Sequence, residues 1–364
     1  MNKSAPVIVM VGTSLDAPGG MTSVIKTYRD CGFFEQWNVT YLSSYQRPGW
    51  MMQCQVMVRA LAQFLALLLR GKVALLHVHS ASRGSFWRKS IFCAIARAFD
   101  VPYIFHVHSG EFPSFLQKEC GALAQAWVRH TLHRAQCVVV LTPGWRATLQ
   151  ELVPEACVTV LGNPVITPQH LGTRRAHTAH VLFLGRLRET KGVFDLVRAM
   201  PQVLARVPQA TFTLAGDGDL AGVAYLAQTL GVQQSLNLPG WVEGASKDAL
   251  LATAYVLVLP SYFEGLPICI LEAMATGIPV VSTAIGGIPE ALEHGASGTL
   301  VTPGDTAALA TALIDTLLDR ESSEHKRQRA FVRARANYST AVILDALTEL
   351  YRGKILKTSI QRVG

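Results

Sequence analysis

The sequence predicts an α/β protein built from two doubly wound parallel sheets, and three observations lead to that prediction. Short β-branched and aliphatic runs alternate with segments that read as helices, as expected for parallel strands covered on both faces. These runs fall into two series, separated by a polar segment rich in turn formers at 163–178. The chain has 364 residues, of which 50% are apolar and 16% charged, enough for two packed domains.

Each strand-like run is short, and each is followed by a segment with helical character. In the first series we expect strands at 7–11, 39–42, 73–78, 103–107 and 137–141. In the second series we expect them at 181–184, 211–215, 235–238, 256–259, 279–282 and 299–301. Two such series predict two Rossmann-like domains, which bind ligands at the carboxyl ends of their strands.

The segment LPSYFEGLPICILEAMATGIPVVSTAIGGIP, residues 259–289, carries two glutamates around the start of one apolar helix. We expect this helix to begin near Leu266 or Pro267. Its first N–H groups can hold a diphosphate. Glu264 and Glu272 would repel phosphate, so we expect them to accept hydrogen bonds from hydroxyls of a sugar and a ribose. The segment therefore predicts a pocket for a phosphorylated sugar.

The same residues carry a resemblance to a known family. Glu264 and Glu272 reproduce the E-x7-E spacing, within EGLP…LEAMATGIPVVST…GGIPE. VLFLGRLRETKGVFDLVRAM (181–200) resembles a G-R-L-x-x-x-K-G segment, and FTLAGDGDL (212–220) resembles a G-x-G turn. The chain thus resembles retaining glycosyltransferases of family 4, which have the GT-B fold, of the type that makes bacterial exopolysaccharide, capsule and lipopolysaccharide.

The resemblance implies a domain arrangement as well as an activity. Two Rossmann-like domains would face each other across a cleft, with 1–165 on the acceptor side and 166–337 binding the nucleotide sugar. The last helix, about 338–364, would pack back on the first domain. The implied activity is transfer of a hexosyl group from a nucleoside-diphosphate sugar to a hydroxyl of a lipid-linked saccharide, with retention at the anomeric carbon.

The resemblance also implies residue roles. Arg186 and Lys191 would neutralise the leaving diphosphate in place of a metal, although the bare sequence also fits a solvated pair at a helix start. His108 would lie near the transferred sugar and act with Arg186, Lys191 and Glu264, and Glu111 is a candidate for acceptor contact. Residues expected to bind the donor are Gly19, Gly20, Gly185, Gly216, Trp241, Val242, Gly265, Leu266, Pro267, Ile268 and Glu272, although Gly19 and Gly20 also fit a plain turn.

Other patterns suggest metal or cofactor sites, and we expect none of them to be one. Asp217 and Asp219 form a D-x-D, but two carboxylates leave most of a magnesium shell to water and substrate. The nearby G-x-G-x-x-A lacks the acidic residue that a dinucleotide site needs after the next strand. The H-x-H pairs 77/79 and 106/108 lack carboxylate or thiolate partners at zinc spacing. The seven scattered cysteines support neither a disulfide framework nor a zinc site.

Positive charge is concentrated in the N-terminal half. Residues 36–99 contain no acid and eight basic residues, Arg47, Arg59, Arg70, Lys72, Arg83, Arg88, Lys89 and Arg97. Together with the apolar helical segment 50–72 they favour an anionic bilayer surface or an anionic lipid-linked acceptor, and not nucleic acid. A buried helix with solvated arginines fits the same pattern.

The N-terminal segment predicts the cellular location of the protein. The apolar run 60–69 is bounded by Arg59 and Arg70 and is too short to span a bilayer. The first residues lack the apolar core of a signal peptide. We expect a cytoplasmic protein that is peripheral on the inner face of the plasma membrane.

Two other functions remain open on the sequence alone. A nucleotide-sugar epimerase could have the same two-domain build. A non-enzymatic peripheral-membrane protein could use the basic region alone, but it would leave Glu264, Glu272, Arg186 and Lys191 unexplained together.

Overall fold

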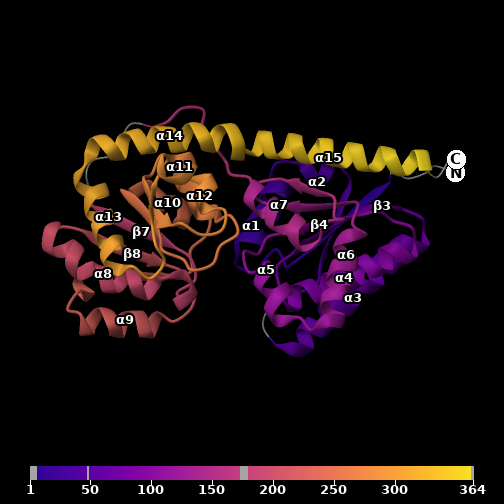
Figure 1. Ribbon diagram of the computed structural model, residues 1–364, viewed down its shortest axis with the longest axis horizontal. Coiled ribbons are helices and arrows are strands. Elements are labelled where there is room, and N and C mark those ends of the chain that lie inside the picture. Colours follow the sequence, from indigo (N-terminus) through magenta and orange to yellow (C-terminus); the bar gives the residue numbers. More distant parts are fainter. Residues whose placement is uncertain (1–5, 47–48, 173–178, 362–364) are drawn as a thin grey trace. The chain divides into compact units, whose positions relative to one another are not determined.

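The chain folds into two compact units, each with its own parallel sheet (Figure 1). The computed structural model describes residues 6–46, 49–172 and 179–361. One unit comprises Met1–Pro164 and Thr340–Gly364, and the other comprises Val165–Ser339. Arg47 of the basic segment and residues 173–178 of the expected linker lie outside the described residues.

The N-terminal unit is built on a six-stranded sheet of order β2-β1-β3-β4-β5-β6. Its strands are β1 Val7–Gly12, β2 Val39–Ser43, β3 Val73–Ser80, β4 Tyr103–Val107, β5 Cys137–Val140 and β6 Val158–Val160. Its helices are α1 Gly20–Asp30, α2 Phe33–Gln36, α3 Trp50–Leu69, α4 Gly84–Ala98, α5 Phe112–Ser114, the π-helical turn η1 Phe115–Glu119, α6 Ala122–His133, α7 Pro143–Leu152 and α15 Thr340–Gln361.

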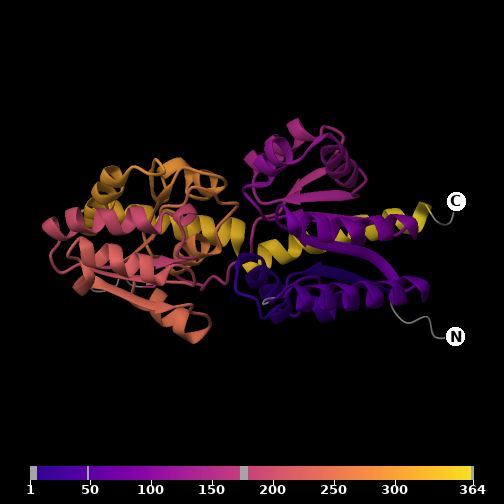
Figure 2. The same cartoon turned by 90° about the horizontal axis from the view of Figure 1, so that it is seen from below.

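Because side chains alternate along a strand, the two faces of this sheet have different cores. One face packs Val78 and Phe105 against Phe64 of α3 and Phe86 of α4. The opposite face carries histidines, and α1, α2 and α15 lie over it. Tyr351 of α15 contacts that face, and α15, yellow in Figure 2, runs along this unit.

The C-terminal unit repeats the plan with the order β12-β11-β10-β7-β8-β9. Its strands are β7 His180–Leu184, β8 Thr211–Ala215, β9 Leu236–Gly240, β10 Val256–Leu259, β11 Val280–Thr283 and β12 Thr299–Val301. Its helices and helical turns are η2 Glu189–Lys191, α8 Val193–Arg206, α9 Leu220–Thr229, η3 Gln233–Ser235, α10 Ala245–Thr253, α11 Ile268–Thr276, α12 Ile288–Ala291, η4 Glu293–Gly295, α13 Thr306–Leu318 and α14 Arg320–Tyr338.

All eleven expected strands are present, with ends that differ by no more than two residues. The sequence missed β6, a three-residue edge strand that pairs only with β5 among the described strands. The predicted α/β class with two parallel sheets is confirmed.

The helix α3 lies within the helical segment predicted at 50–72, but two expectations about its apolar length and its burial are wrong. It begins at Trp50 and accommodates Arg59, so by length and composition it is long and apolar enough to cross a membrane, against the expectation of a run that is too short. Its most apolar window has a mean hydropathy of 1.5 and is only 17% buried. The alternative of a buried helix is therefore also wrong for most of α3.

Candidate active site in the C-terminal unit

Two loops of the C-terminal unit, each at the carboxyl end of a strand, are in close backbone contact at a glycine. A Cβ atom on Gly216, after β8, would lie 1.7 Å from the carbonyl oxygen of Gly185, after β7. The Leu187 N–H donates to the Asp217 carbonyl at 2.7 Å, and the Asp219 N–H donates back to Leu187 at 2.9 Å. Gly216 therefore permits a close backbone contact with Gly185, which places the Arg186 loop at the sheet edge.

Lys191 and Glu264 form an ion pair at the carboxyl ends of β7 and β10. Lys191 Nζ lies 2.5 Å from Glu264 Oε1, and Ser261 Oγ donates to the same oxygen at 2.8 Å. Gly192, next to the lysine, has φ of +66°, and a Cβ there would lie 1.9 Å from the Pro260 carbonyl oxygen. The pair is thus held by backbone contacts as well as by charge.

A second ion pair joins Glu272, within α11, to a lysine of α10. Lys247 Nζ lies 2.5 Å from Glu272 Oε1. Burial raises the pKa of Glu272, and the nearby positive charge of Lys247 opposes that shift. Each of the two glutamates therefore forms an ion pair with a different lysine.

Cys269 indicates that these charges share one neighbourhood. Burial, together with the carboxylates Glu264 and Glu272 and against the opposing effect of Lys191, raises the pKa of this thiol to about 12. Glu264 lies four residues before α11 and contacts Lys191, and Glu272 lies within the helix, so these groups surround its start.

The helix α11 begins at Ile268, slightly later than expected. Pro267 has ψ of 127° and is the residue before the helix, so the start predicted at Leu266 or Pro267 is early by one or two residues. No side chain caps this end. Gly265, Leu266 and Pro267 are buried and lead directly into it. The predicted position of the two glutamates, one before the helix and one within it, is correct.

The Asp217 and Asp219 side chains are already engaged. Arg186 Nε lies 3.4 Å from Asp217 Oδ1. Asp219 caps α9, and its Oδ1 accepts from the Gly222 N–H at 2.8 Å. The D-x-D pattern therefore has a structural explanation. Asp217 pairs with Arg186, and Asp219 is the N-cap of α9.

Trp241 and Val242 lie directly after β9, before the helix that carries Lys247. Trp241 is 41% exposed and Val242 is half-buried. An exposed tryptophan offers a flat apolar surface with a polar N–H, which suits a nucleotide base.

The remaining predicted residues belong to the N-terminal unit. Gly19 has φ of +148° and precedes Gly20, the first residue of α1, with open space where a Cβ would stand. His108 Nε2 is 2.9 Å from His79 Nδ1, and burial, with a smaller effect of Lys89, lowers the pKa of His108 to about 3. Glu111 accepts from Arg83 Nη1 at 2.6 Å.

The residues that position the predicted site residues could not be identified from the sequence. Ser261 and the pairing of Lys247 with Glu272 were not predicted, because these contacts depend on which strand ends meet. The same holds for Gly286, where a Cβ would lie 2.0 Å from the Glu264 carbonyl oxygen. The serine lies three residues before Glu264, which is the only local signal.

Comparison with known proteins assigns the family. A family model described as "Glycosyl transferases group 1" matches residues 178–319, and one described as "Glycosyl transferase 4-like domain" matches residues 13–164. Together these segments make up more than half of the chain. The chain therefore belongs to this family of glycosyltransferases, and its fold class is GT-B.

The relatives are distant and varied. The chain is 28% identical over 270 residues to a glycogen synthase of Mycobacterium tuberculosis, covering 71% of this chain and 64% of the relative. The match thus spans less than two thirds of that protein. A putative colanic acid biosynthesis glycosyltransferase, WcaL of Salmonella typhimurium, is 32% identical over 178 residues, 47% of this chain and 44% of the relative.

Among solved structures, Anabaena Alr3699/HepE in complex with UDP-glucose is similar in fold. It has a TM-score of 0.75 and 19% identity, covering 95% of this chain and 99% of that chain. This likeness supports the GT-B fold.

Proposed function

We propose that this protein is a retaining glycosyltransferase that moves a sugar from a nucleoside-diphosphate sugar to a hydroxyl of a lipid-linked saccharide in surface polysaccharide synthesis. The observation that carries the proposal is the pair of half-buried lysine–glutamate contacts around the start of α11, Lys191 with Glu264 and Lys247 with Glu272. The relative bound to UDP-glucose favours a UDP-sugar donor. WcaL supports the polysaccharide setting.

In this proposal the positive charges stabilise the leaving diphosphate. Lys191 and Arg186 each share their charge with one carboxylate in the free protein, so both are already in place when an anion arrives. Preorganised charge of this kind stabilises developing negative charge without reorganisation. Glu264 and Glu272 would accept hydrogen bonds from the sugar and the ribose, which positions the anomeric carbon for attack by the acceptor. Retention follows from the family resemblance.

We also propose that transfer does not need a divalent ion. The support is that Arg186 holds Asp217 and that Asp219 caps α9, so neither carboxylate is set aside for a metal. Turnover should continue in EDTA. Loss of activity that magnesium or manganese restores would instead make Asp217 and Asp219 metal ligands.

The acceptor proposal draws on the surface of α3. This helix packs on the sheet through Ala60, Phe64 and Leu68, so it lies along the unit and leaves its outer face free. Exposed apolar residues recur on that outer face with the spacings seven, seven and four, which keep them on one side of a helix: Met51, Val58, Leu65 and Leu69. Arg59 and Arg70 are exposed beside this stripe.

An exposed apolar stripe with flanking arginines suits the interface of an anionic bilayer. A lipid-linked acceptor is found at such a surface. We therefore place the protein on the inner face of the plasma membrane, held through α3. Lys89 takes no part in this surface because it is fully buried.

The test is donor binding followed by product analysis. UDP-, GDP- and ADP-sugars are screened by thermal shift, since a ligand that binds only the folded state raises its apparent stability. The donor that binds is then offered with a lipid-linked saccharide extract, and the anomeric configuration of the product is read by NMR. A saccharide product with the donor's configuration supports the proposal. An inverted product, or a free isomeric nucleotide sugar, overturns it.

A further inference from the structure

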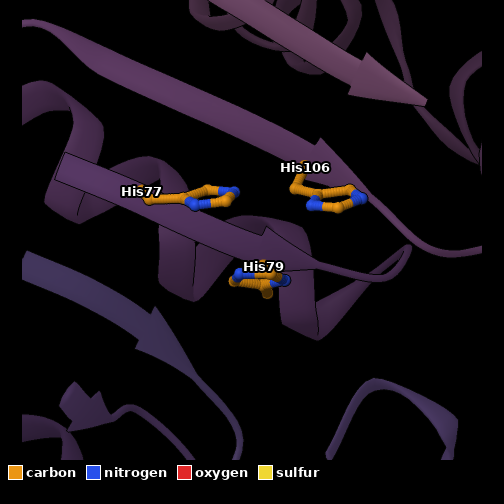
Figure 3. A group of neighbouring side chains, drawn as sticks. All are labelled: His77, His79 and His106. Carbon is orange, nitrogen blue, oxygen red and sulfur yellow. The ribbon is translucent and has the colours of Figure 1, made fainter. Parts of the chain in front are cut away.

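Three histidines gather on one face of the N-terminal sheet. His77 and His79 alternate along β3, and His106 of β4 is the register partner of His79. All three side chains are fully buried. The ring centroids are 4.3 Å apart for His77 and His79, 4.9 Å for His79 and His106, and 5.5 Å for His77 and His106. Figure 3 shows the three rings, which come from two neighbouring strands.

Four imidazole nitrogens of this cluster have no hydrogen-bond partner. His77 Nδ1 is 2.7 Å from the Tyr351 hydroxyl, and His79 Nδ1 is 2.9 Å from His108 Nε2. The Nε2 atoms of His77 and His79 and both nitrogens of His106 are buried without a partner. Buried polar atoms are nearly always satisfied in proteins, so four in one cluster call for a ligand.

The tautomers of these histidines decide which lone pairs are free. In the tautomer in which Nδ1 of His77 and of His79 carries the proton, the Nε2 atoms of both residues carry free lone pairs. His106 has no partner at either nitrogen, so it offers one lone pair in either neutral tautomer.

The hydrogen bonds of His77 and His79 follow the pattern that metal-binding histidines adopt. Such a histidine binds the ion through one nitrogen and donates its other N–H to an oxygen or another acceptor, which fixes the ring orientation. The candidate ligand atoms of His77, His79 and His106 lie within 4.8 Å of one another. Two nitrogens that share one zinc ion are at most about 4.2 Å apart, so the rings must rotate to bring their nitrogens onto one ion.

We propose that His77, His79 and His106 bind one transition-metal ion of the zinc class inside the N-terminal unit. Three histidines are an established zinc ligand set, with a fourth position for water. The hydroxyl of Tyr28, whose ring lies 6.1 Å from that of His79, is buried without a partner and is available to a water at that position. The sequence offered no carboxylate or thiolate at zinc spacing, but the structure brings three imidazole side chains together instead.

The charge in this neighbourhood limits the affinity. Lys89, also fully buried, acts electrostatically on His79 and His108, and its positive charge opposes a bound dication. The site is enclosed by β3, β4, α1 and α15, so a bound ion would stabilise this unit. The inference rests on the histidine cluster and not on the proposed function, although His79 contacts His108, a candidate catalytic residue.

The test uses the tag-free full chain, stripped with a chelator and then loaded with Zn²⁺ or Co²⁺. We expect one zinc ion per chain by elemental analysis after gel filtration, a tetrahedral Co²⁺ absorption spectrum, and a higher melting temperature with zinc. His77→Gln and His106→Gln should abolish all three signals. His130→Gln, which changes an exposed histidine of the same unit, should leave them intact.

A second variant keeps the test valid if the glutamine variants do not fold. Tyr351→Phe retains all three ligands and removes only the hydrogen bond to His77, so it should weaken zinc affinity by about 10- to 100-fold. The proposal is overturned if the wild-type chain retains no zinc above the level of a control protein. It is also overturned if His77→Gln binds zinc as well as the wild type does.

Discussion

At the residue scale, the site depends on which charged groups meet. Glu264, Glu272, Arg186 and Lys191 could be predicted from the sequence because each lies next to a strand end or helix start with a recognisable local pattern. Their partners could not, since Lys191 and Glu264 are 73 residues apart and Lys247 and Glu272 are 25 apart. Local spacing carries no signal for contacts between strand ends, which form only when the sheet order is fixed.

The first prediction concerns the two cations. Arg186→Ala and Lys191→Ala should each lower kcat by about 100-fold or more, because each removes a preorganised charge from the leaving diphosphate. Arg188→Ala is the matched control, since Arg188 is exposed on the same loop and should leave kcat unchanged. Steady-state kinetics with the identified donor measures this, with circular dichroism to confirm folding. Activity of both variants within a few-fold of wild type would remove these residues from the site.

The second prediction separates the two glutamates. Glu272→Gln should weaken nucleotide binding, because this carboxylate is expected to hold the ribose, whereas Glu264→Gln should mainly lower kcat through its position near the sugar. Calorimetric titration with the nucleotide gives the first quantity and turnover gives the second. Glu189→Gln, an exposed carboxylate near Lys191, is the control. The same kinetic defect in both site variants would contradict separate roles.

At the scale of elements, the sequence predicted the interior strands more accurately than the edge strand β6 and the exposure of the helix α3. The interior strands are mostly apolar and buried, as expected of parallel strands, whereas β6 is three residues long and half-buried. The helical extent of α3 was predicted as 50–72, but its apolar length was underestimated, because Arg59 looks like an end of the apolar run. In the structure its side chain points to solvent from mid-helix, so the helix continues.

The third prediction tests the contact between the loops after β7 and β8. Gly216→Ala should destabilise the C-terminal unit by about 3 kcal/mol, because its Cβ would overlap the Gly185 carbonyl oxygen and the backbone must move. Gly353→Ala has open space around its Cβ and lies in α15, so it should be neutral or stabilising. Urea unfolding followed by fluorescence measures both. An unchanged midpoint for Gly216→Ala would show that the two loops are not held at this distance.

At the scale of the whole molecule, the two units divide the chemistry and the charge. Apart from His108, Gly19 and Gly20, the residues predicted for the diphosphate, the sugar and the ribose lie in the C-terminal unit, together with their lysine and serine partners. The N-terminal unit carries the excess of basic residues, and the exposed apolar stripe of α3 lies there too. The sequence predicted this division of charge, but it could not show that Lys89 is buried while Arg59 and Arg70 are exposed. That distinction depends on helix packing.

The last prediction is that the protein binds anionic bilayers through α3. The triple variant Arg59→Gln/Arg70→Gln/Lys72→Gln should release it from phosphatidylglycerol vesicles, since each cation near such a surface contributes about 1 kcal/mol. The double variant Val58→Ser/Leu69→Ser should do the same by removing apolar contact. Sedimentation with vesicles measures binding, which should weaken as salt rises because the Debye length falls to about 8 Å at physiological ionic strength.

A matched triple variant separates this surface from net charge alone. Lys118→Gln/Arg134→Gln/Arg146→Gln removes the same charge from exposed positions of the same unit outside α3, and it should retain vesicle binding. Equal release by both triples would mean that overall charge, and not the α3 surface, attracts the protein. Wild-type protein that stays in solution with anionic vesicles at low salt would show that α3 does not bind bilayers. Because the donor site lies in the other unit, nucleotide binding should be unchanged in every α3 variant. That result would show that the substitutions impair vesicle binding alone.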